Sequence, residues 1–149
     1  MKLTIELVPK TAWYSNVRSN VTKHEWDLIR NKCYVKASHK CELCKDVGTN
    51  QGVKHKVECH EIFEYDDINH IQKLTQLIAL CPYCHKVKHP GLAEMNGEID
   101  IVIAQLIKVN NMSDIEAKQY IKDSFKMWKE RSKYNWKLDI SCLQNYLNS

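Results

Sequence analysis

Residues 80–91, LCPYCHKVKHPG, carry four side chains of types that commonly bind metals. Cys81 and Cys84 are separated by two residues, a spacing that lets both thiolates reach one ion. His85 and His89 are four residues apart, so on a helix they share a face that is rotated away from Cys84. The stretch therefore predicts two ligand sets on one short helix, with the cysteines serving one ion and the histidines another.

A second C-x-x-C pair, Cys41 and Cys44, lies upstream of the first. Two such pairs are a strong signal for zinc, because four sulfurs close a tetrahedral shell and leave no position for water. We therefore predict a structural zinc ion whose binding contributes to folding, held by Cys41, Cys44, Cys81 and Cys84. A thiol redox protein is the alternative, but no strand–helix–strand pattern surrounds the pairs.

The segment VECHEIFEY, residues 57–65, lies between the two cysteine pairs and is rich in β-branched and aromatic residues. This composition predicts a strand. A strand–strand–helix unit pinned by the cysteines would bring His60 opposite the helix that carries the two histidines. Because side chains alternate along a strand, Glu58 shares a face with His60, while Glu61 shares a face with Cys59. We interpret Glu61 as a solvated position at the strand edge in preference to a partner of a metal site.

The order of these motifs resembles the HNH nuclease motif, in the form of the ββα-metal fold that carries a zinc ribbon, over about residues 41–91. The resemblance rests on C-x-x-C, a ligand-type residue followed by histidine in a strand, and L-x-x-L-C-x-x-C-H-x-x-x-H. It implies that His60 is the general base and that His85 and His89 hold a divalent cation on the scissile phosphate. It also implies that Cys59, which precedes the base, stands at the position of a further ligand to this cation.

The activity that the resemblance implies is hydrolysis of phosphodiester bonds in DNA by an endonuclease or nickase. Its second cation would be Mg²⁺, Mn²⁺, Ni²⁺ or Zn²⁺, and a soft thiolate at Cys59 disfavours Mg²⁺. The family's middle asparagine, which orients the base, has Gln76 or Asn69 as its candidate. The alternative is a catalytically degenerate zinc module of the same fold that binds nucleic acid or a protein partner without cleaving.

The elements that position these residues follow from hydrophobic periodicity and capping signals. Thr22 with Glu25, and Ser113 with Glu116, have capping-box spacing, and Pro82 suits the first turn of a helix that Pro90 ends. We expect residues 135–147 to dock on the core. The expected strands span residues 2–9, 53–65 and 74–81, and the expected helices span residues 22–40, 82–89, 97–111 and 113–133.

These elements predict an α+β protein with a zinc-stabilised ββα-metal core flanked by N- and C-terminal helices. We expect one domain over residues 1–149, divided into an N-terminal strand and helix (1–40), the HNH-like core (41–91) and a helical C-terminal part (92–149).

The composition sets limits on the class of protein. The 149 residues are 44% hydrophobic, enough for a modest core, and the net charge of +4 is compatible with nucleic acid without requiring it. No apolar run of about 18 residues and no signal peptide occur, which predicts a cytoplasmic protein without a membrane partner. In that setting seven cysteines favour metal ligation over disulfides. The basic residues that adjoin the predicted site are candidate nucleic-acid contacts: Lys54, Lys56, Lys86 and Lys88.

Overall fold

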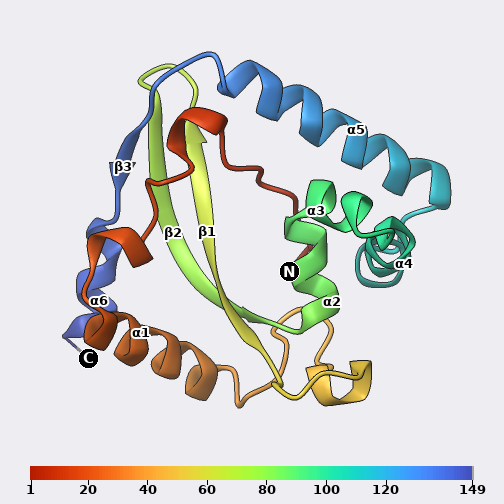
Figure 1. The fold of residues 1–149 in the computed structure, drawn as a ribbon, viewed down its shortest axis with the longest axis horizontal. Coiled ribbons are helices and arrows are strands. Elements are labelled where there is room, and N and C mark those ends of the chain that lie inside the picture. The colour runs from red at the N-terminus through yellow and green to blue at the C-terminus, as the bar shows by residue number, and fades with distance from the viewer. Residues whose placement is uncertain (149) are drawn as a thin grey trace.

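A computed structural model describes residues 1–148 and has a small sheet at its centre (Figure 1). Strands β1 (Glu58–Asp66) and β2 (Ile71–Leu80) form an antiparallel hairpin, and β3 (Lys137–Asp139) pairs in parallel with the first residues of β2. The expected α+β class is confirmed. The helices are α1 (Lys23–Lys36), α2 (Pro82–Lys88), α3 (Pro90–Met95), α4 (Ile99–Asn110), α5 (Asp114–Arg131) and α6 (Gln144–Leu147).

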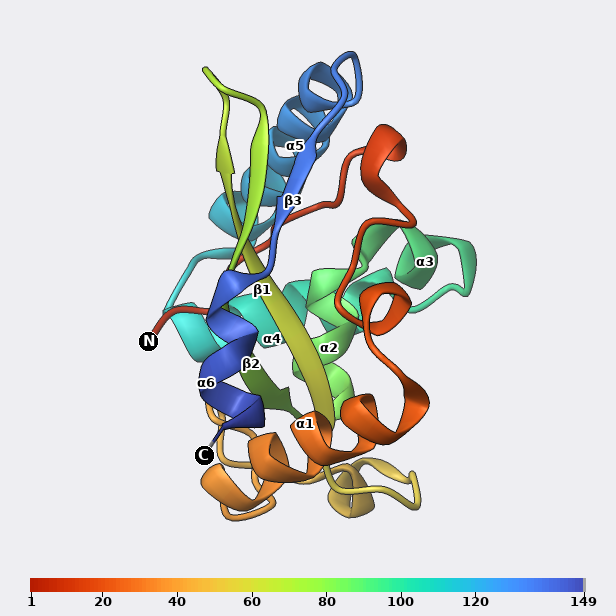
Figure 2. The same ribbon diagram turned by 90° about the vertical axis from the view of Figure 1, so that its left-hand side faces the viewer.

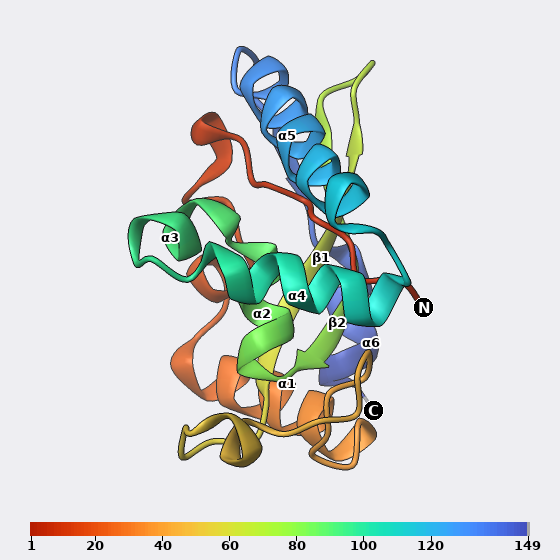
Figure 3. The same ribbon diagram turned by 90° about the vertical axis from the view of Figure 1, so that its right-hand side faces the viewer.

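The two faces of the hairpin pack against different helices. Ile78 and Leu80 of β2 face a core formed with α2, α4 and α5, which lie in front of the strands in Figure 3. Leu77 and Ala79 face a second core formed with α1 and the C-terminal segment, which lie in front in Figure 2. Because side chains alternate along a strand, neighbouring residues of β1 also enter different cores.

The predicted strand near the N-terminus is wrong, although its alternation is real. Leu3 and Ile5 are buried, yet residues 1–9 are not part of the sheet. The backbone of Leu3 exchanges two hydrogen bonds of 2.8 and 2.7 Å with the side chain of Asn110, and the N–H of Ile5 donates to the hydroxyl of Tyr120 at 2.9 Å. The segment runs between α4 and α5 (Figure 3), and side chains of these helices take the place of a neighbouring strand.

The predicted helices are confirmed, with three corrections, of which the first is that α1 ends at Lys36, four residues before the expected end at residue 40. Thr22 and Glu25 form the full capping box of α1, and the Ser113 hydroxyl accepts from the N–H of Glu116 at the start of α5. Pro90 ends α2 as expected but also begins the short helix α3. Hydrophobic spacing predicts that Ile115 joins the buried face of α5, but Ile115 is 79% exposed, because it lies about 200° around the helix from Ala117, which is buried in the core.

The two long strands differ from prediction only at their ends. β1 begins at Glu58, so residues 53–57 of the expected strand lie outside the observed one, and β2 begins three residues earlier than expected, at Ile71. The C-terminal segment docks as predicted, because β3 joins the sheet and Leu143 is buried. Within residues 1–148, no helix combines the length and the apolar character needed to cross a membrane.

Candidate metal centres

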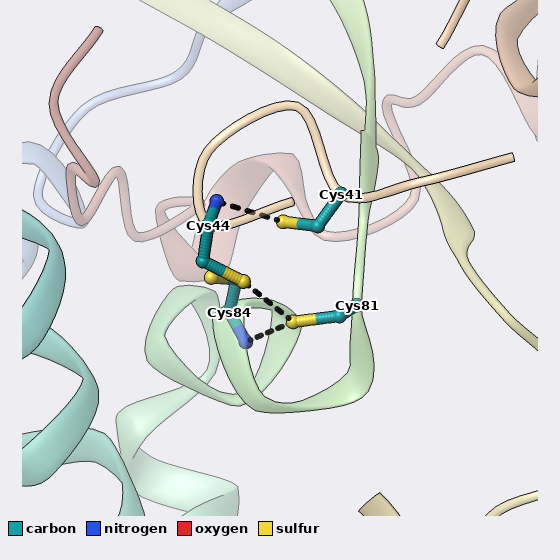
Figure 4. Close-up of side chains that lie close together, drawn as sticks. All are labelled: Cys41, Cys44, Cys81 and Cys84. Atoms are coloured by element: carbon teal, nitrogen blue, oxygen red, sulfur yellow. Dashed lines mark hydrogen bonds between the residues drawn. The ribbon is translucent and has the colours of Figure 1, made fainter. Parts of the chain in front are cut away.

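The four cysteines predicted to bind zinc come together where β2 ends and α2 begins (Figure 4). Cys41 and Cys44 reach this point because the intervening Glu42 docks on β2: its N–H donates to the carbonyl of Ala79 at 2.9 Å, and its carboxylate accepts from the N–H of Ala79 at 2.7 Å. All four sulfurs lie within 4.8 Å of one another. The sulfurs of Cys44 and Cys81 are 3.5 Å apart, close to the edge of about 3.8 Å that a zinc–sulfur tetrahedron requires.

The surroundings of these sulfurs suit thiolates. The backbone N–H groups of Cys44 and Cys84 point at the sulfurs of Cys41 and Cys81 at 3.5 and 3.4 Å, and the amide of Gln105 on α4 donates to the sulfur of Cys84 at 3.1 Å. Such donors stabilise negative sulfur and orient it. Three of the four cysteines, all except Cys44, are buried.

Contacts among the four thiols shift their pKa values in opposite directions. Hydrogen bonds from Cys44, Cys81 and Cys84 lower the pKa of Cys41, whereas contact with Cys41 raises the pKa of Cys84. The cause is that one thiolate is stabilised by its neighbours while a further thiolate would repel it. A divalent cation removes this conflict because it neutralises several thiolates together. These four residues can therefore bind a metal such as zinc.

Three histidines form a second group on the other side of α2. His60 of β1 lies beside His85 and His89, with ring centroids 5.2 and 5.7 Å away, and the centroids of His85 and His89 are 4.9 Å apart. One ring nitrogen from each residue can be chosen so that all three lie within 4.8 Å of one another. The predicted convergence of β1 with the histidine face of α2 is therefore present in the structure.

Glu58 lies beside the three histidines, although no role was predicted for it from the sequence. Its carboxylate contacts Nδ1 of His85 and lies 2.9 Å from Nε2 of His55. The hydrogen bond to His85 is the main cause that keeps the pKa of Glu58 below its usual range. With Nδ1 engaged, Nε2 is the nitrogen of His85 that stays free to bind a metal. The sequence could have indicated that Glu58 belongs to this group, because alternation along the strand already places Glu58 on the face of His60.

Burial keeps two of the histidines neutral at pH 7. Removal of water around the ring, with smaller contributions from the charges of His85 and Lys88, lowers the pKa of His60 well below 6.5. The His89 side chain is exposed to solvent at the end of the group, but the protein atoms packed around the ring and the charge of His85 lower its pKa to about 4. A neutral imidazole is the form that binds a metal or accepts a proton.

Cys59, predicted from the resemblance as a ligand of the second cation, does not join the histidines. In the hairpin register Cys59 lies opposite Ala79, whereas His60 lies opposite Ile78, so the two side chains point to different faces. Cys59 packs in the core beside α1, where contact with the thiol of Cys33 and burial raise its pKa. The ligand role of Cys59 is therefore not supported by the fold.

Neither candidate for the asparagine that orients the base lies at His60. The side-chain amide of Asn69 donates to Asp66 at 2.9 Å and closes the hairpin turn. Gln76 lines a groove beside α1 and α6. Among residues 1–148 no side chain forms a hydrogen bond with the ring of His60.

The interpretation of Glu61 as a solvated edge position is wrong. Its carboxylate accepts from the backbone N–H of Val17 at 3.0 Å, and burial raises its pKa, an effect that backbone hydrogen bonds from Val17 and Arg18 oppose. Glu61 thus fixes the turn at residues 17–18 beside β1.

The lysines predicted to contact nucleic acid fall into two sets. Lys54 and Lys56 are exposed. Lys86 pairs with Glu98 at 3.0 Å, and Lys88 is only 3% exposed and donates to Glu6 at 3.0 Å. Lys88 is therefore not available to solvent.

A cleft of about 760 Å³ opens beside the histidine group. Its lining includes His60 and His89, together with apolar side chains of residues 7–13, α3 and α5. The four cysteines are not among its lining residues. The histidine group therefore faces a space that a ligand can enter, and the cysteine group does not.

Comparison with known proteins gives no relative: no family model, curated protein or solved structure matches the chain.

Proposed function

We propose that this chain is a metal-dependent endonuclease or nickase of the HNH type, which hydrolyses phosphodiester bonds in DNA. The observation that carries the proposal is the convergence of His60 on β1 with His85 on α2 and with His89, which caps the C-terminal end of α2, beside a cleft that His60 and His89 line. The consecutive order of β1, β2 and α2 supports it, since this is the order expected of a ββα-metal unit. In the proposal a structural zinc on the four cysteines holds the joint between β2 and α2.

His60 has the role of general base. Its neutral ring can accept the proton of a water molecule that attacks the phosphate, and it lies on the cleft wall, where a substrate can reach it. His85 and His89 hold the second cation, and Glu58 keeps the His85 ring oriented through Nδ1. A divalent cation at this position supplies positive charge for the developing phosphorane and the leaving oxygen.

The donor set of the second site is nitrogen without sulfur, because Cys59 faces the other core. Imidazole ligands suit Zn²⁺ and Ni²⁺ better than they suit Mg²⁺. Among Mg²⁺, Mn²⁺, Ni²⁺ and Zn²⁺, we therefore expect Ni²⁺ or Zn²⁺ to bind most tightly at His85 and His89.

The test combines DNA cleavage with metal counting. Zinc-loaded protein, stripped of exchangeable ions, is incubated with supercoiled plasmid and with single-stranded circular DNA in the presence of each of the four cations. We expect cleavage with at least one cation, and at least a hundredfold loss in His60→Ala, since a positioned base contributes about 10²–10⁴-fold. His24→Ala is the matched control, because His24 is exposed on α1 away from the site.

Binding of the second cation separates the roles of the histidines. By calorimetry, His85→Ala should lose the exchangeable ion while His60→Ala retains it. Absence of cleavage with all four cations, or equal cleavage by His60→Ala, would overturn the proposal.

A non-catalytic zinc module that binds nucleic acid or a protein partner is the second candidate. It is favoured by the absence of a hydrogen-bond partner for the His60 ring among the described residues, since a catalytic base is normally oriented by such a partner. In this case all three histidines would hold one ion together. Loss of the exchangeable ion in His60→Ala, with no cleavage by the parent protein, would identify this candidate.

A further inference from the structure

The cleft beside His60 has mainly apolar walls. Aromatic side chains on its lining come from four separate parts of the chain, the N-terminal segment, α1, β1 and α5, and include Trp13, Trp26, Phe63 and Trp128. Helix α3 adds Leu92 and Met95. These walls adjoin a histidine group that we propose to act on a charged phosphodiester. An apolar wall at this place suits an apolar part of the molecule that carries the phosphodiester.

Several of these apolar side chains are open to solvent. Trp13 is 60% exposed, Leu92 is 59% exposed and Met95 is 84% exposed. Large apolar side chains gathered at the mouth of a cleft are typical of a binding site, whereas single ones scattered on a surface are ordinary. Tyr14, the neighbour of Trp13, is 90% exposed but is not among the lining residues of the cleft.

Few positive charges line the cleft. Its cationic side chains other than histidine are Arg18 and Lys88, and Lys88 is buried against Glu6. Arg18 has no carboxylate partner within residues 1–148. The carboxylate of Glu61 accepts hydrogen bonds from the backbone of residues 17 and 18, and Arg18 lines both this cleft and a second one. The second cleft has a volume of about 710 Å³ and also contains Lys23 and Arg30, but Asp27 pairs with both at 3.0 Å.

The exposed apolar and aromatic side chains of the cleft favour an unpaired strand over a duplex. The bases of a duplex are stacked inside it and present no face to an apolar wall. The bases of a single strand do present their faces, and aromatic side chains bind them without regard to sequence.

We propose that the cleft binds single-stranded nucleic acid, with a base against Trp13 and the backbone passing Arg18 to reach His60. This inference rests on the proposed function, because it takes the phosphodiester at His60 as the reacting bond. It adds the substrate class: an unpaired stretch of the strand lies in the cleft.

The experiment measures binding without cleavage, so that it does not depend on activity. Fluorescein-labelled (dT)12 is titrated with zinc-loaded protein lacking other divalent ions, and fluorescence anisotropy gives its affinity. A (dT)12–(dA)12 duplex and (rU)12 form parallel arms. We expect (dT)12 to bind at least tenfold more tightly than the duplex, and the (rU)12 arm reports whether the cleft distinguishes DNA from RNA.

Variants test the residues that carry the inference. Trp13→Ala should weaken (dT)12 binding about tenfold, the loss expected for one stacked base, while Trp13→Phe retains most of the affinity. Tyr14→Ala is the matched control and should bind like the parent. Arg18→Ala should weaken binding and reduce its dependence on salt.

Three outcomes would overturn the inference: tighter binding of the duplex, equal weakening by Trp13→Ala and Tyr14→Ala, or no binding of any oligonucleotide, as expected if the cleft instead takes an apolar peptide. The first two leave the proposed endonuclease activity intact if plasmid or circular DNA is still cleaved. Conversely, tight (dT)12 binding without cleavage would retain the inference on binding and refute the catalytic proposal.

Discussion

The cysteine group and the histidine group share helix α2 but differ in their surroundings. The cysteines are mostly buried, accept hydrogen bonds from backbone N–H groups and from Gln105, and contact one another. The histidines lie between β1 and α2, with the His85 side chain 28% exposed, and two of them line a cleft. A closed set of four sulfurs suits an ion that holds the fold, whereas an open set of imidazoles suits an ion that meets a ligand.

One short helix can present two groups of potential metal ligands because its turns point residues in different directions. Cys84 faces Gln105 of α4, while His85, the next residue, faces Glu58 of β1. Adjacent residues on a helix differ in direction by about 100°. The two groups can therefore be altered separately, and the following predictions use this property.

The largest effect is expected from the cysteine group. Cys84→Ser removes one of four thiolates, and zinc binding in small domains contributes about 10–16 kcal/mol, comparable to or larger than a typical net stability of about 5–15 kcal/mol. We expect loss of bound zinc and of a cooperative thermal transition, measured by metal analysis and far-UV circular dichroism. Cys142→Ser, at a free cysteine outside the group, should retain both. If Cys84→Ser keeps the parent's zinc content and melting curve, the four cysteines do not hold a structural zinc ion.

A smaller loss is expected at the ion pair beneath the histidine group. Lys88 is nearly fully buried and donates to Glu6 and to the carbonyl of Thr4. Glu6→Gln leaves its charge without a counter-ion, which costs about 3 kcal/mol in free energy of unfolding, measured by urea denaturation of zinc-loaded protein. The double variant with Lys88→Met added should recover most of the lost stability. Glu64→Gln, at an exposed position, should change the free energy of unfolding little. Equal midpoints for the parent and Glu6→Gln would contradict the prediction.

Cys59→Ala tests the assignment of this residue to the core beside α1. Because its thiol contacts Cys33 and faces away from His60, we expect a loss of about 1 kcal/mol in stability and unchanged affinity for the exchangeable ion. Calorimetric titration with Ni²⁺ measures the affinity, with His85→Ala as the variant that should lose it. A tenfold weaker affinity in Cys59→Ala would mean that the thiol reaches the ion.

The smallest effect on stability is expected at His89. Its ring lies at the exposed end of the histidine group, so His89→Ala should change the free energy of unfolding by less than about 0.5 kcal/mol. Thermal unfolding of zinc-loaded protein without other divalent ions is the measurement. A loss approaching that of Glu6→Gln would show that the histidines also support the fold, and the contrast between the two groups would weaken.

Local spacing in the sequence determined the ligand groups and most of the elements. Two residues between cysteines and three between histidines have the same consequence wherever a turn or helix forms, so the cysteine pairs and the histidine pair could be predicted before any fold was known. Capping residues placed the start of α1 and α5 for the same reason. The alternation rule also separates Cys59 from His60, and the resemblance to the HNH motif led to a ligand assignment that this rule opposes.

Only the tertiary structure decided the remaining features. Glu58 contacts His85 because β1 and β2 bring the start of one strand beside the helix that follows the other. Residues 1–9 are held by side chains of α4 and α5, and Trp13 meets α3 and α5 across one cleft. The contacts of Leu3 and Ile5 join residues more than a hundred positions apart, and the contact of Glu58 with His85 joins residues 27 positions apart. They depend on how the helices pack over both faces of the sheet, and no spacing within a short segment contains that information.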